Sequence, residues 1–388
     1  MSASEIRGWC PGAHRPMMSG DGLVVRVRPP AGELTRRQAS GLADAAERYG
    51  NGQIELTNRA NLQVRGVSND NYASLLSDLA DLDLLDHDAS TERRRNIVTD
   101  PFRATDPDDP QQVISMALAQ GLSSSCFEDL PSKFGFVIDS GPERQLAAIR
   151  GDIRIEASGS DLIVRADGQE LGRAVQNASA AVELALDLAK WFIASGGIGD
   201  DRRGRMVRHF AQGAILPIKG DSHPNPVAKP SVPGPRRQGL LLAAVFGQLA
   251  SADLRWLAQS LTTNIRITPW RMVYVPSTIR QAVLAGSDGL ILDPDDPLLR
   301  ISACTGAPAC PQANMKTRDI AREVARYLPV TARLHVSGCA KGCAHPKPCE
   351  LTLVGREGGF DLIRNGAAWD EPDLRAIPPE RLQEFIGG

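Results

Sequence analysis

The 388-residue sequence predicts an α+β fold assembled from duplicated units. The stretch that begins at Gly22 and the stretch that begins at Gly239 share one order of expected elements: strand, helix, strand, tight link, strand. A weaker similarity relates "RRNIVTDPFRATDP" to "RISACTGAPACPQ", and a helical pattern and a strand follow each of them. Because each half is too small for a complete core, we expect the halves to pair into one sheet-based body.

The first copy shows its elements through hydrophobic periodicity. Apolar side chains alternate along residues 23–28, which is typical of a strand. Thr35 can cap the following helix, which carries an apolar stripe along residues 42–49. Gly50 ends the helix, and alternation resumes along residues 54–56.

The second copy repeats this order with more apolar residues. Residues 240–245 form an apolar strand, and residues 265–267 begin the next strand. The helix between them is marked by Leu254, Leu257 and Leu261. The proline-rich residues 221–239 are expected to link the two large halves of the chain.

Composition limits the compartment and the partners. The formal net charge of −2 gives no global attraction for nucleic acid. No stretch approaches the roughly 20 apolar residues that cross a membrane, and the N-terminus has no apolar signal-peptide core. We therefore expect a cytoplasmic protein, in which clustered thiols serve as metal ligands or catalytic groups rather than disulfides.

Four of the seven cysteines lie close together in the sequence, at Cys304, Cys310, Cys339 and Cys343. The x₃ pair fits the spacing of a zinc site loosely, and the x₅ pair fits it poorly. Four thiolates can also hold an iron–sulfur cube. Pro311 can begin a helix that runs to Pro329, which would place a positive helix N-terminus beside an anionic cluster. Gly338 and Gly342 allow backbone amides to approach the sulfurs. This favours a [4Fe–4S] cluster over zinc or unligated thiols.

The remaining cysteines have structural or open roles. Cys10 and His14 either ligate a mononuclear iron or belong to a mobile terminus. Cys349 precedes a strand-like run and is expected to be a core thiol. Cys126 is also expected to be structural.

Two histidines and the "ITPWR" segment complete the candidates. His335 lies in an apolar run and is expected in a strand. His345 is expected to be a hydrogen-bond partner or a surface residue rather than a ligand. In "ITPWR", Trp270 is expected in the core and Arg271 in a cleft.

The motifs of the chain resemble those of the nitrite/sulfite reductase superfamily. "IELTNRANLQVRG" resembles that family's half-domain signature, "RRRNIVT" its Arg-Asn stretch and "LPSKFGF" its lysine motif. The resemblance implies a pseudo-two-fold duplicated fold with two ferredoxin-like half-domains and two α/β domains. We expect the half-domains at 15–75 and 236–285, an α/β domain without cluster cysteines at 88–220, and an α/β domain with the cluster at 295–388.

The same resemblance implies roles for particular residues. In those reductases the four cysteines hold a [4Fe–4S] cluster, and the sulfur of the last one, Cys343 here, bridges to sirohaem iron. Basic side chains bind the sirohaem carboxylates and the anionic substrate; the matching positions are Arg26 or Arg28, Arg59, Arg95 and Lys133. Of these, Lys133 and Arg95 are expected to act at the reacting group.

One departure separates this chain from the reductases. Their lysine motif reads K-F-K, whereas this chain has Lys133, Phe134 and Gly135. A paired cationic site stabilises a small oxyanion. The missing second lysine therefore argues against sulfite or nitrite as the substrate.

The opening of the chain points to another branch of the superfamily. "CPGAHRPMMSGDGLVVRVRP" resembles the opening of precorrin-3B synthases. This resemblance implies O₂-dependent hydroxylation of precorrin-3A with γ-lactone formation in aerobic cobalamin biosynthesis. It also implies a [4Fe–4S] cluster, a mononuclear non-haem iron and an NADH-linked or ferredoxin-like electron donor, with the tetrapyrrole where the reductases hold sirohaem. The alternatives are a sirohaem-dependent sulfite or nitrite reductase and a non-enzymatic metal-binding module.

Overall fold

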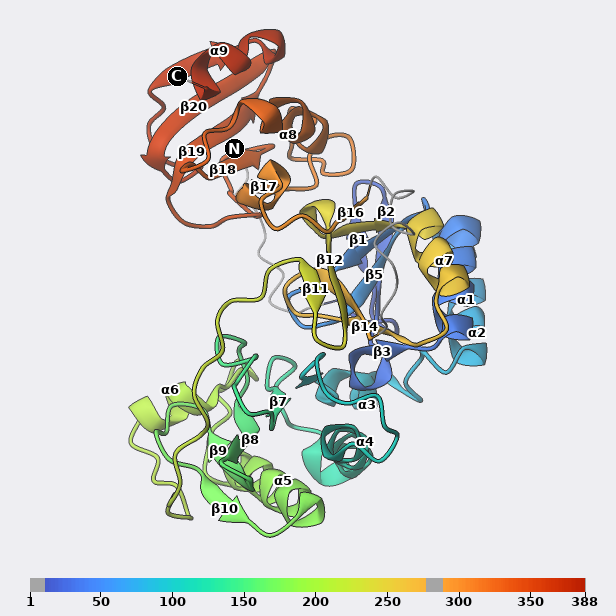
Figure 1. Cartoon of the computed structure of the whole chain (residues 1–388), viewed down its shortest axis with the longest axis vertical. Helices are drawn as coiled ribbons and strands as arrows, with labels where there is room; N and C mark the ends of the chain where they lie inside the picture. The colour runs from blue at the N-terminus through green and yellow to red at the C-terminus, as the bar shows by residue number, and fades with distance from the viewer. Residues whose placement is uncertain (1–10, 277–288, 388) are drawn as a thin grey trace.

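The computed structural model describes residues 11–276 and 289–387 and arranges them in three tiers. Figure 1 shows a central body that carries β1–β5 and β11–β16, with one α/β domain at each end. The domain with β6–β10 lies at one end, and the domain with β17–β21 lies at the other. No helix among the described residues is long and apolar enough to cross a membrane.

The central body contains two antiparallel sheets that exchange a strand. The first has the order β1 (Met17–Ser19), β2 (Gly22–Val27), β5 (Leu62–Val67), β4 (Gln53–Leu56) and β13 (Gln248–Ala250). The second has the order β11 (Gly234–Arg236), β12 (Gly239–Ala244), β15 (Met272–Val275), β14 (Ile265–Ile267) and β3 (Glu33–Leu34), with β16 (Leu290–Ile291) beside β12.

The exchanged strands explain why the halves form one body. β3 of the first half pairs with β14 of the second, and β13 of the second half pairs with β4 of the first. Each half therefore completes the other's sheet, and their apolar side chains share one core. The expected pairing of the two halves is confirmed.

Three helices cover this body on one side (Figure 1). They are α1 (Arg36–Tyr49), α2 (Asn69–Asp81) and α7 (Ser251–Ser260), and α1 packs against α7. Thr35 caps α1 as predicted, because its side chain accepts from the N–H of Gln38 while the Gln38 side chain accepts from the N–H of Thr35. α7 has no side-chain cap, and it ends one residue before Leu261.

The two α/β domains share one topology. The first sheet has the order β10 (Arg173–Val175), β9 (Asp161–Ala166), β8 (Ile153–Ser158), β7 (Phe136–Asp139) and β6 (Ile97–Thr99). The second has the order β17 (Ile301–Ala303), β18 (Leu334–Ser337), β19 (Cys349–Arg356), β20 (Gly359–Gly366) and β21 (Leu374–Ile377). In each sheet the first three strands along the chain are parallel and the last two are antiparallel. The weaker sequence similarity therefore reflects a second duplication.

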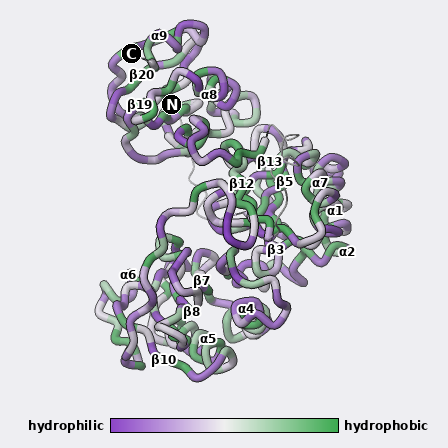
Figure 2. The backbone as a smooth tube through the Cα atoms, viewed as in Figure 1, coloured by the Kyte–Doolittle hydropathy of each residue, from purple (hydrophilic) through white to green (hydrophobic). Residues whose placement is uncertain are grey.

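Short and long helices complete both domains. The first domain has α3 (Ala89–Arg94), α4 (Pro110–Leu122), α5 (Ala178–Ala194) and α6 (Met206–Ala211), and the second has α8 (Arg318–Val324) and α9 (Gln383–Ile386). The 3-10 turns are η1 (Pro30–Gly32), η2 (Ser125–Phe127), η3 (Val245–Gly247), η5 (Pro297–Arg300), η6 (Ala325–Tyr327) and η7 (Pro379–Arg381). In Figure 2, apolar residues gather in the interior of the central body, around β5 and β13.

One sequence expectation about the connections needs correction. The helix expected from Pro311 begins only at Arg318, because the preceding loop is held by tertiary bonds, including Asn314 N–H to Gly338 O at 3.0 Å. The proline-rich residues 221–239 connect the first α/β domain to the second half of the central body. They contain β11 and pair with the first α/β domain through the Arg144–Val227 bridge.

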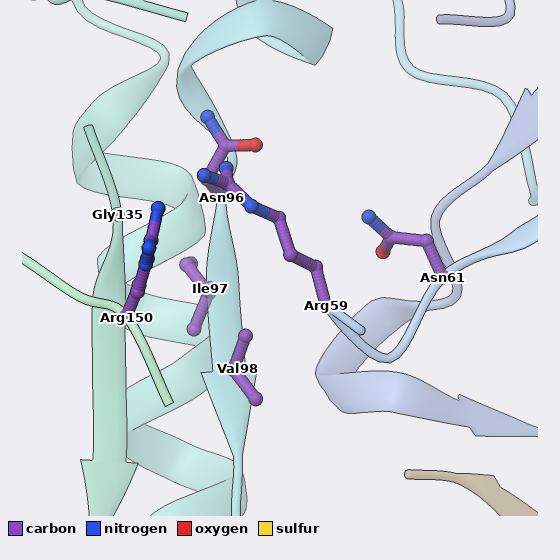
Figure 3. A pocket seen from close by; sticks show the side chains of 7 residues that line it. All are labelled: Arg59, Asn61, Asn96, Ile97, Val98, Gly135 and Arg150. Carbon is purple, nitrogen blue, oxygen red and sulfur yellow. The ribbon is translucent and has the colours of Figure 1, made fainter. Parts of the chain in front are cut away.

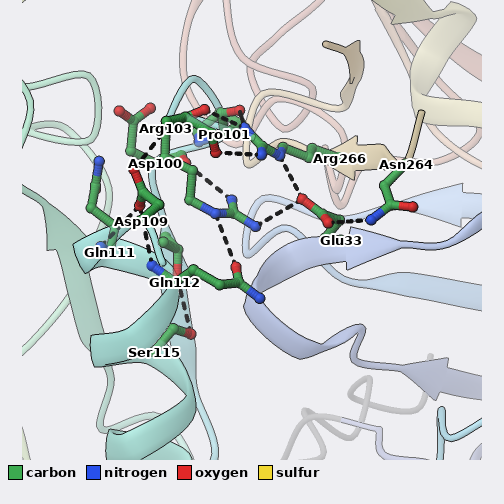
Figure 4. Close-up of polar contacts among 12 residues, drawn as sticks. Glu33, Asp100, Pro101, Arg103, Asp109, Gln111, Gln112, Ser115, Asn264 and Arg266 are labelled. Atoms are coloured by element: carbon green, nitrogen blue, oxygen red, sulfur yellow. Dashed lines mark hydrogen bonds and ion pairs between the residues drawn. The ribbon is translucent and has the colours of Figure 1, made fainter. Parts of the chain in front are cut away.

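A buried polar junction fastens the first α/β domain to the central body (Figure 4). Glu33 on β3 accepts hydrogen bonds from Arg266 at 2.6 Å, from Asn264 at 2.6 Å and from Arg103 at 3.1 Å. Arg266 also donates to the backbone oxygens of Pro101 and Arg103. A carboxylate that is shared by two buried arginines fixes the angle between these parts of the chain.

Candidate functional site

The four clustered cysteines lie at one edge of the second α/β sheet. Cys304 directly follows β17, and Cys339 follows β18 by two residues. These strands are adjacent and parallel, so their carboxyl ends meet at the same edge. Cys310 and Cys343 lie on the loops that continue from these strands.

The four thiols are within electrostatic range of one another. Burial raises the pKa of the Cys343 thiol, and the neighbouring thiols of Cys339, Cys304 and Cys310 raise it further. Cys343 is nevertheless exposed enough to line a cavity. The structure thus brings together all four residues that the sequence singled out, while their role as ligands stays a prediction.

The backbone around the cysteines is shaped for close approach. The N–H of Gly338 donates to Sγ of Cys304 at 3.1 Å, and Thr317 Oγ1 donates to the carbonyl oxygen of Cys304 at 2.6 Å. A Cβ on Gly338 would lie 2.5 Å from Cβ of Ala313, and a Cβ on Gly306 would lie 2.5 Å from Thr317 Oγ1. Side chains are therefore excluded where backbone amides must reach sulfur.

This donor set fits a [4Fe–4S] cluster. Four thiolates with an N–H donor to sulfur are the usual protein environment of such a cube, and each thiolate binds a different iron. Among the described residues, no three His, Cys, Asp or Glu side chains are arranged to hold a single metal ion. The identity of the bound metal centre stays a prediction, and the described residues offer no ligand set for a mononuclear iron.

Cys304 and Cys343 open into a cavity of about 280 Å³. Its walls come from the central body and from the second α/β domain. The lining residues are Arg26, Glu55, Leu56, Thr57, Asn58, Gln63, Phe246, Gly247, Arg271, Ala303, Thr305, Arg318 and Ala344, besides the two cysteines. Three arginines face one carboxylate here, and that carboxylate, Glu55, is already paired with Arg318 at 2.8 Å and Arg65 at 3.6 Å. The cavity therefore suits an anionic ligand.

The structure separates the two arginines that the sequence left as alternatives. Arg26 on β2 lines the cavity with the cysteines. Arg28 points elsewhere, and its guanidinium donates to the carbonyl oxygen of Glu92 at 2.6 Å and to Oδ1 of Asn96 at 2.9 Å. Burial lowers the pKa of Arg28 to about 10. Of the two, Arg26 is placed for a ligand beside the cysteines.

Arg59 and Lys133 meet at the boundary with the first α/β domain. Nη2 of Arg59 lies 3.5 Å from the carbonyl oxygen of Lys133, whose own side chain is exposed. Figure 3 shows the Arg59 side chain extending between Asn61 and Asn96, with Arg150 on the far side of Asn96. Arg150 is a further basic residue in this crevice, and no sequence motif marked it.

Arg95 is occupied by protein partners. It forms two hydrogen bonds with Asp86, at 2.6 and 2.8 Å, and a third with the carbonyl oxygen of Arg28 at 2.8 Å. A ligand carboxylate would have to compete with this arrangement. The expected roles of Arg95 and Lys133 in substrate binding stay predictions.

Asn96 is the positioning residue that the sequence indicated only as part of "RRRN". Its Nδ2 donates to the carbonyl oxygens of Ser132 and Phe134, at 3.1 and 3.2 Å, and its Oδ1 accepts from Arg28. It thereby holds the lysine segment against the end of α3. A buried side-chain amide whose hydrogen-bond donors and acceptor are all paired is typical of a residue that positions a loop.

The basic residues do not all share one cavity. The cavity with Cys304 and Cys343 is lined by no residue from 88–220, whereas the crevice beside Arg59 is lined mainly by that domain. The loop of residues 57–61 connects the two, because Thr57 and Asn58 line the first and Arg59 lines the second.

A larger cavity, of about 650 Å³, is lined by residues of the central body and of the first α/β domain and has mixed charge. Five arginines, Arg15, Arg28, Arg93, Arg202 and Arg203, line it together with four acidic residues. Arg202 pairs with Asp129 in an exposed ion pair at 3.2 Å. Because its charges nearly balance, this cavity is a weaker candidate for a polyanion.

In the first α/β domain, an acid takes the place of a cluster cysteine. The N–H of Asp100 donates to Ile138 O at 2.9 Å, and the N–H of Cys304 donates to Val336 O at 3.2 Å. The two residues each directly follow the first strand of their sheet. Asp100 is buried, and burial raises its pKa. The half without cluster cysteines therefore keeps the backbone pattern of the cluster site.

The other candidates have structural environments. Nε2 of His14 lies 2.7 Å from the carbonyl oxygen of Asp86, and its expected partner Cys10 lies outside the described residues. His335 is buried in β18 and Cys349 is buried at the start of β19, as predicted. Cys126 is exposed in η2 and is not a core thiol.

The "ITPWR" segment divides between core and cavity. The Trp270 ring stacks on Phe102 with 5.7 Å between the ring centres, and Arg271 lines the cavity that contains Cys343. His345 contacts the carbonyl oxygen of Pro348 at 3.3 Å.

Comparisons with known proteins agree with this geometry. Residues 15–82 match the model of the nitrite/sulfite reductase ferredoxin-like half domain. Over 94% of this chain and 84% of the relative, the sequence is 34% identical to a precorrin-3B synthase of Sinorhizobium sp.. The chain belongs to the precorrin-3B synthase family. That family lies within the reductase superfamily that the motifs resemble, so the first expectation of family is confirmed.

The nitrite reductases are more distant than this precorrin-3B synthase. A ferredoxin–nitrite reductase of Synechococcus elongatus is 24% identical over 88% of this chain and 77% of its own. The NirA protein of Mycobacterium tuberculosis superposes with a TM-score of 0.65 at 18% identity, over 94% of this chain and 79% of that chain. This likeness shows the nitrite/sulfite reductase fold with its two half-domains and two α/β domains, as predicted. The limits of the four domains remain predictions.

Proposed function

We propose that this chain converts precorrin-3A to precorrin-3B, by an O₂-dependent hydroxylation that accompanies γ-lactone formation. The observation that carries the proposal is the cavity in which Arg26, Arg271 and Arg318 lie beside Cys304 and Cys343. A tetrapyrrole with many carboxylates needs several cationic side chains around a redox centre. The 34% identity to a precorrin-3B synthase supports the same substrate.

The cysteines would hold a [4Fe–4S] cluster, which when bound supplies single electrons to the neighbouring cavity. The chain's own residues contribute binding and orientation. Arg26 neutralises carboxylates beside the cysteines, and Thr57 and Asn58 line the same cavity, while Arg59 on the same loop lines the neighbouring crevice. Two electrons and two protons are needed to reduce the second oxygen atom of O₂ to water, and a reductant such as NADH or a ferredoxin-like protein would provide the electrons.

Isotope labelling tests the proposal directly. Purified protein that is given precorrin-3A, ¹⁸O₂ and a reductant should place label in the tetrapyrrole. The same preparation should show negligible sulfite-dependent or nitrite-dependent oxidation of a dye donor, even with added sirohaem. Fast sulfite or nitrite turnover without label would instead identify a sirohaem-dependent reductase.

An absorption spectrum of anaerobically purified protein separates the candidates before any assay. A broad iron–sulfur shoulder alone agrees with the proposal. Sharp Soret and red bands would indicate bound sirohaem and favour the reductase.

A further inference from the structure

Among the described residues, each half of the central body holds, at corresponding turns, a pair of residues other than glycine in the left-handed region. In the first half they are Ala31, with φ of 50°, and Ala60, with φ of 53°; in the second half they are Phe246, with φ of 56°, and Arg271, with φ of 61°. Ala31 and Phe246 lie in the middle of η1 and η3. Ala60 and Arg271 shortly precede β5 and β15. The strained positions therefore correspond, and the turn geometry of the duplicated unit explains them.

The side chains at these positions do not correspond. The first half has alanine at both, the smallest side chain with a Cβ. The second half has the large side chains Phe246 and Arg271, and both of them line the cavity with Cys304 and Cys343. Long side chains are uncommon in this backbone region. The turn explains the left-handed backbone conformation of Arg271, but it does not explain why this position carries an arginine.

The placement of Arg271 is specific. Its aliphatic stem crosses Gly247, because a Cβ on Gly247 would lie 2.7 Å from Cδ of Arg271. Among the described residues, its exposed guanidinium has no hydrogen bond or ion pair with protein. Arg318, across the same cavity, is held by Glu55. Arg271 thus presents an uncommitted cation beside the cluster cysteines.

We infer that Arg271 binds a peripheral carboxylate of the tetrapyrrole and orients that edge of the macrocycle toward Cys343. The inference rests on the proposed function and names Arg271 as one residue that determines how the tetrapyrrole is oriented. A guanidinium can hold a carboxylate through two parallel hydrogen bonds, which fixes orientation as well as affinity. The pseudo-symmetric Ala60 cannot do this, so only the cluster side of the body gains the contact.

Porphyrin binding provides a test that needs no turnover. Uroporphyrin, with eight carboxylates, and mesoporphyrin, with two, serve as probes whose fluorescence reports binding. Arg271→Asn removes the cation and keeps a residue that tolerates the left-handed region. Its uroporphyrin affinity should fall roughly tenfold, with an unchanged iron–sulfur spectrum and an unchanged or higher melting temperature. Arg208→Gln, an exposed arginine on α6 that lines none of the cavities described above, is the control and should bind normally.

A pair of glycine variants tests the position of the Arg271 side chain rather than its charge. Gly247→Ala and Gly32→Ala impose the same backbone cost, because φ is 73° and 69° at these residues. Only the first displaces the Arg271 stem, since the nearest atom to a Cβ on Gly32 is Ile267 O at 3.4 Å. Both variants should lose similar stability, and only Gly247→Ala should lose uroporphyrin affinity.

The outcomes separate this inference from the proposed function. Equal uroporphyrin affinity in the unmodified protein and in Arg271→Asn would overturn the role of Arg271 and leave the proposed function standing. A loss of the iron–sulfur spectrum in Arg271→Asn would also overturn it, because the residue would then be structural. If the unmodified protein binds neither porphyrin, the tetrapyrrole substrate itself is contradicted.

Discussion

The backbone N–H of Gly338 lies 3.1 Å from Sγ of Cys304 and donates a hydrogen bond to it. Gly338 follows β18 and Cys304 follows β17, so the contact joins the ends of two neighbouring parallel strands. Hydrogen bonds to cluster sulfurs raise the reduction potential and orient the ligand. The close packing around this contact requires glycine, because a Cβ on residue 338 would lie 2.5 Å from Cβ of Ala313.

Gly338→Ala should impair cluster assembly. Its Cβ would collide with Ala313, and overpacking of this kind costs roughly 1–3 kcal/mol. We expect a lower iron content for each protein molecule and a lower melting temperature. Gly141→Ala, whose Cβ would have its nearest neighbour at 3.4 Å, is the matched control. An unaltered iron–sulfur absorbance in Gly338→Ala would contradict the importance of this approach.

Cys343→Ser should abolish the iron–sulfur absorbance and turnover. A hydroxyl is a much weaker iron ligand than a thiolate, and Cys343 also faces the cavity. Cys126→Ser is the control, because Cys126 is exposed in the other α/β domain. Retention of both the spectrum and the activity in Cys343→Ser would show that the cluster has other ligands.

Gly135→Lys should fold and should increase the affinity for sulfite. A Cβ at this position would meet Asn96 O at 3.4 Å, an ordinary contact, and φ is not in the left-handed region. The variant restores the K-F-K pattern and doubles the cationic charge of the motif. Sulfite should then raise its melting temperature more than that of the unmodified protein. An equal response in both proteins would mean that Gly135 does not determine the anion preference.

Arg95→Gln should reduce stability, because it leaves Asp86 without its bidentate partner. The two side chains are 15% and 10% exposed, and breaking a buried pair costs on the order of 3 kcal/mol, less where water reaches it. Denaturant unfolding of Arg95→Gln, Asp86→Asn and the double variant measures the coupling. If Arg95→Gln loses uroporphyrin affinity at unchanged stability, Arg95 is a ligand-binding residue as the family resemblance implies.

Asp139 should make stability fall as pH rises from about 4 to about 7. Burial, together with the nearby Asp100 carboxylate, raises its pKa to about 7. A carboxyl with a raised folded pKa is most stable in its protonated form, so stability decreases from about pH 4 to about pH 7. Asp139→Asn should flatten the dependence of the melting temperature on pH in this window. An unchanged slope in the variant would contradict the assignment.

The pKa of Glu33 is shifted in the opposite direction to that of Asp139, so Glu33 affects stability at lower pH. Burial opposes ionisation of Glu33, but the hydrogen bonds from Arg266 and Asn264 outweigh it and lower its pKa. Its contribution is therefore present above about pH 4.5 and is lost as pH falls through the lower folded value. The loss belongs to the acid side and does not interfere with the measurement on Asp139.

The sequence by itself determined the elements and the family. Thr35 with Gln38 marks a helix start through bonds between residues three apart, which any local segment can satisfy. Alternation along residues 23–28 and the spacing of the cysteines are likewise local. For the same reason the duplication, the α+β class and the set of four clustered cysteines could be predicted from residues alone.

Only the tertiary structure decided which of these residues meet. The exchange of β3 and β13, the separation of Arg26 from Arg28, and the pairing of Arg95 with Asp86 depend on contacts between segments far apart in the chain. The start of α8 at Arg318 depends on them too, because bonds to residue 338 hold the preceding loop out of the helix. Periodicity and spacing report the local backbone, whereas the site is formed by long-range packing, which no single segment specifies.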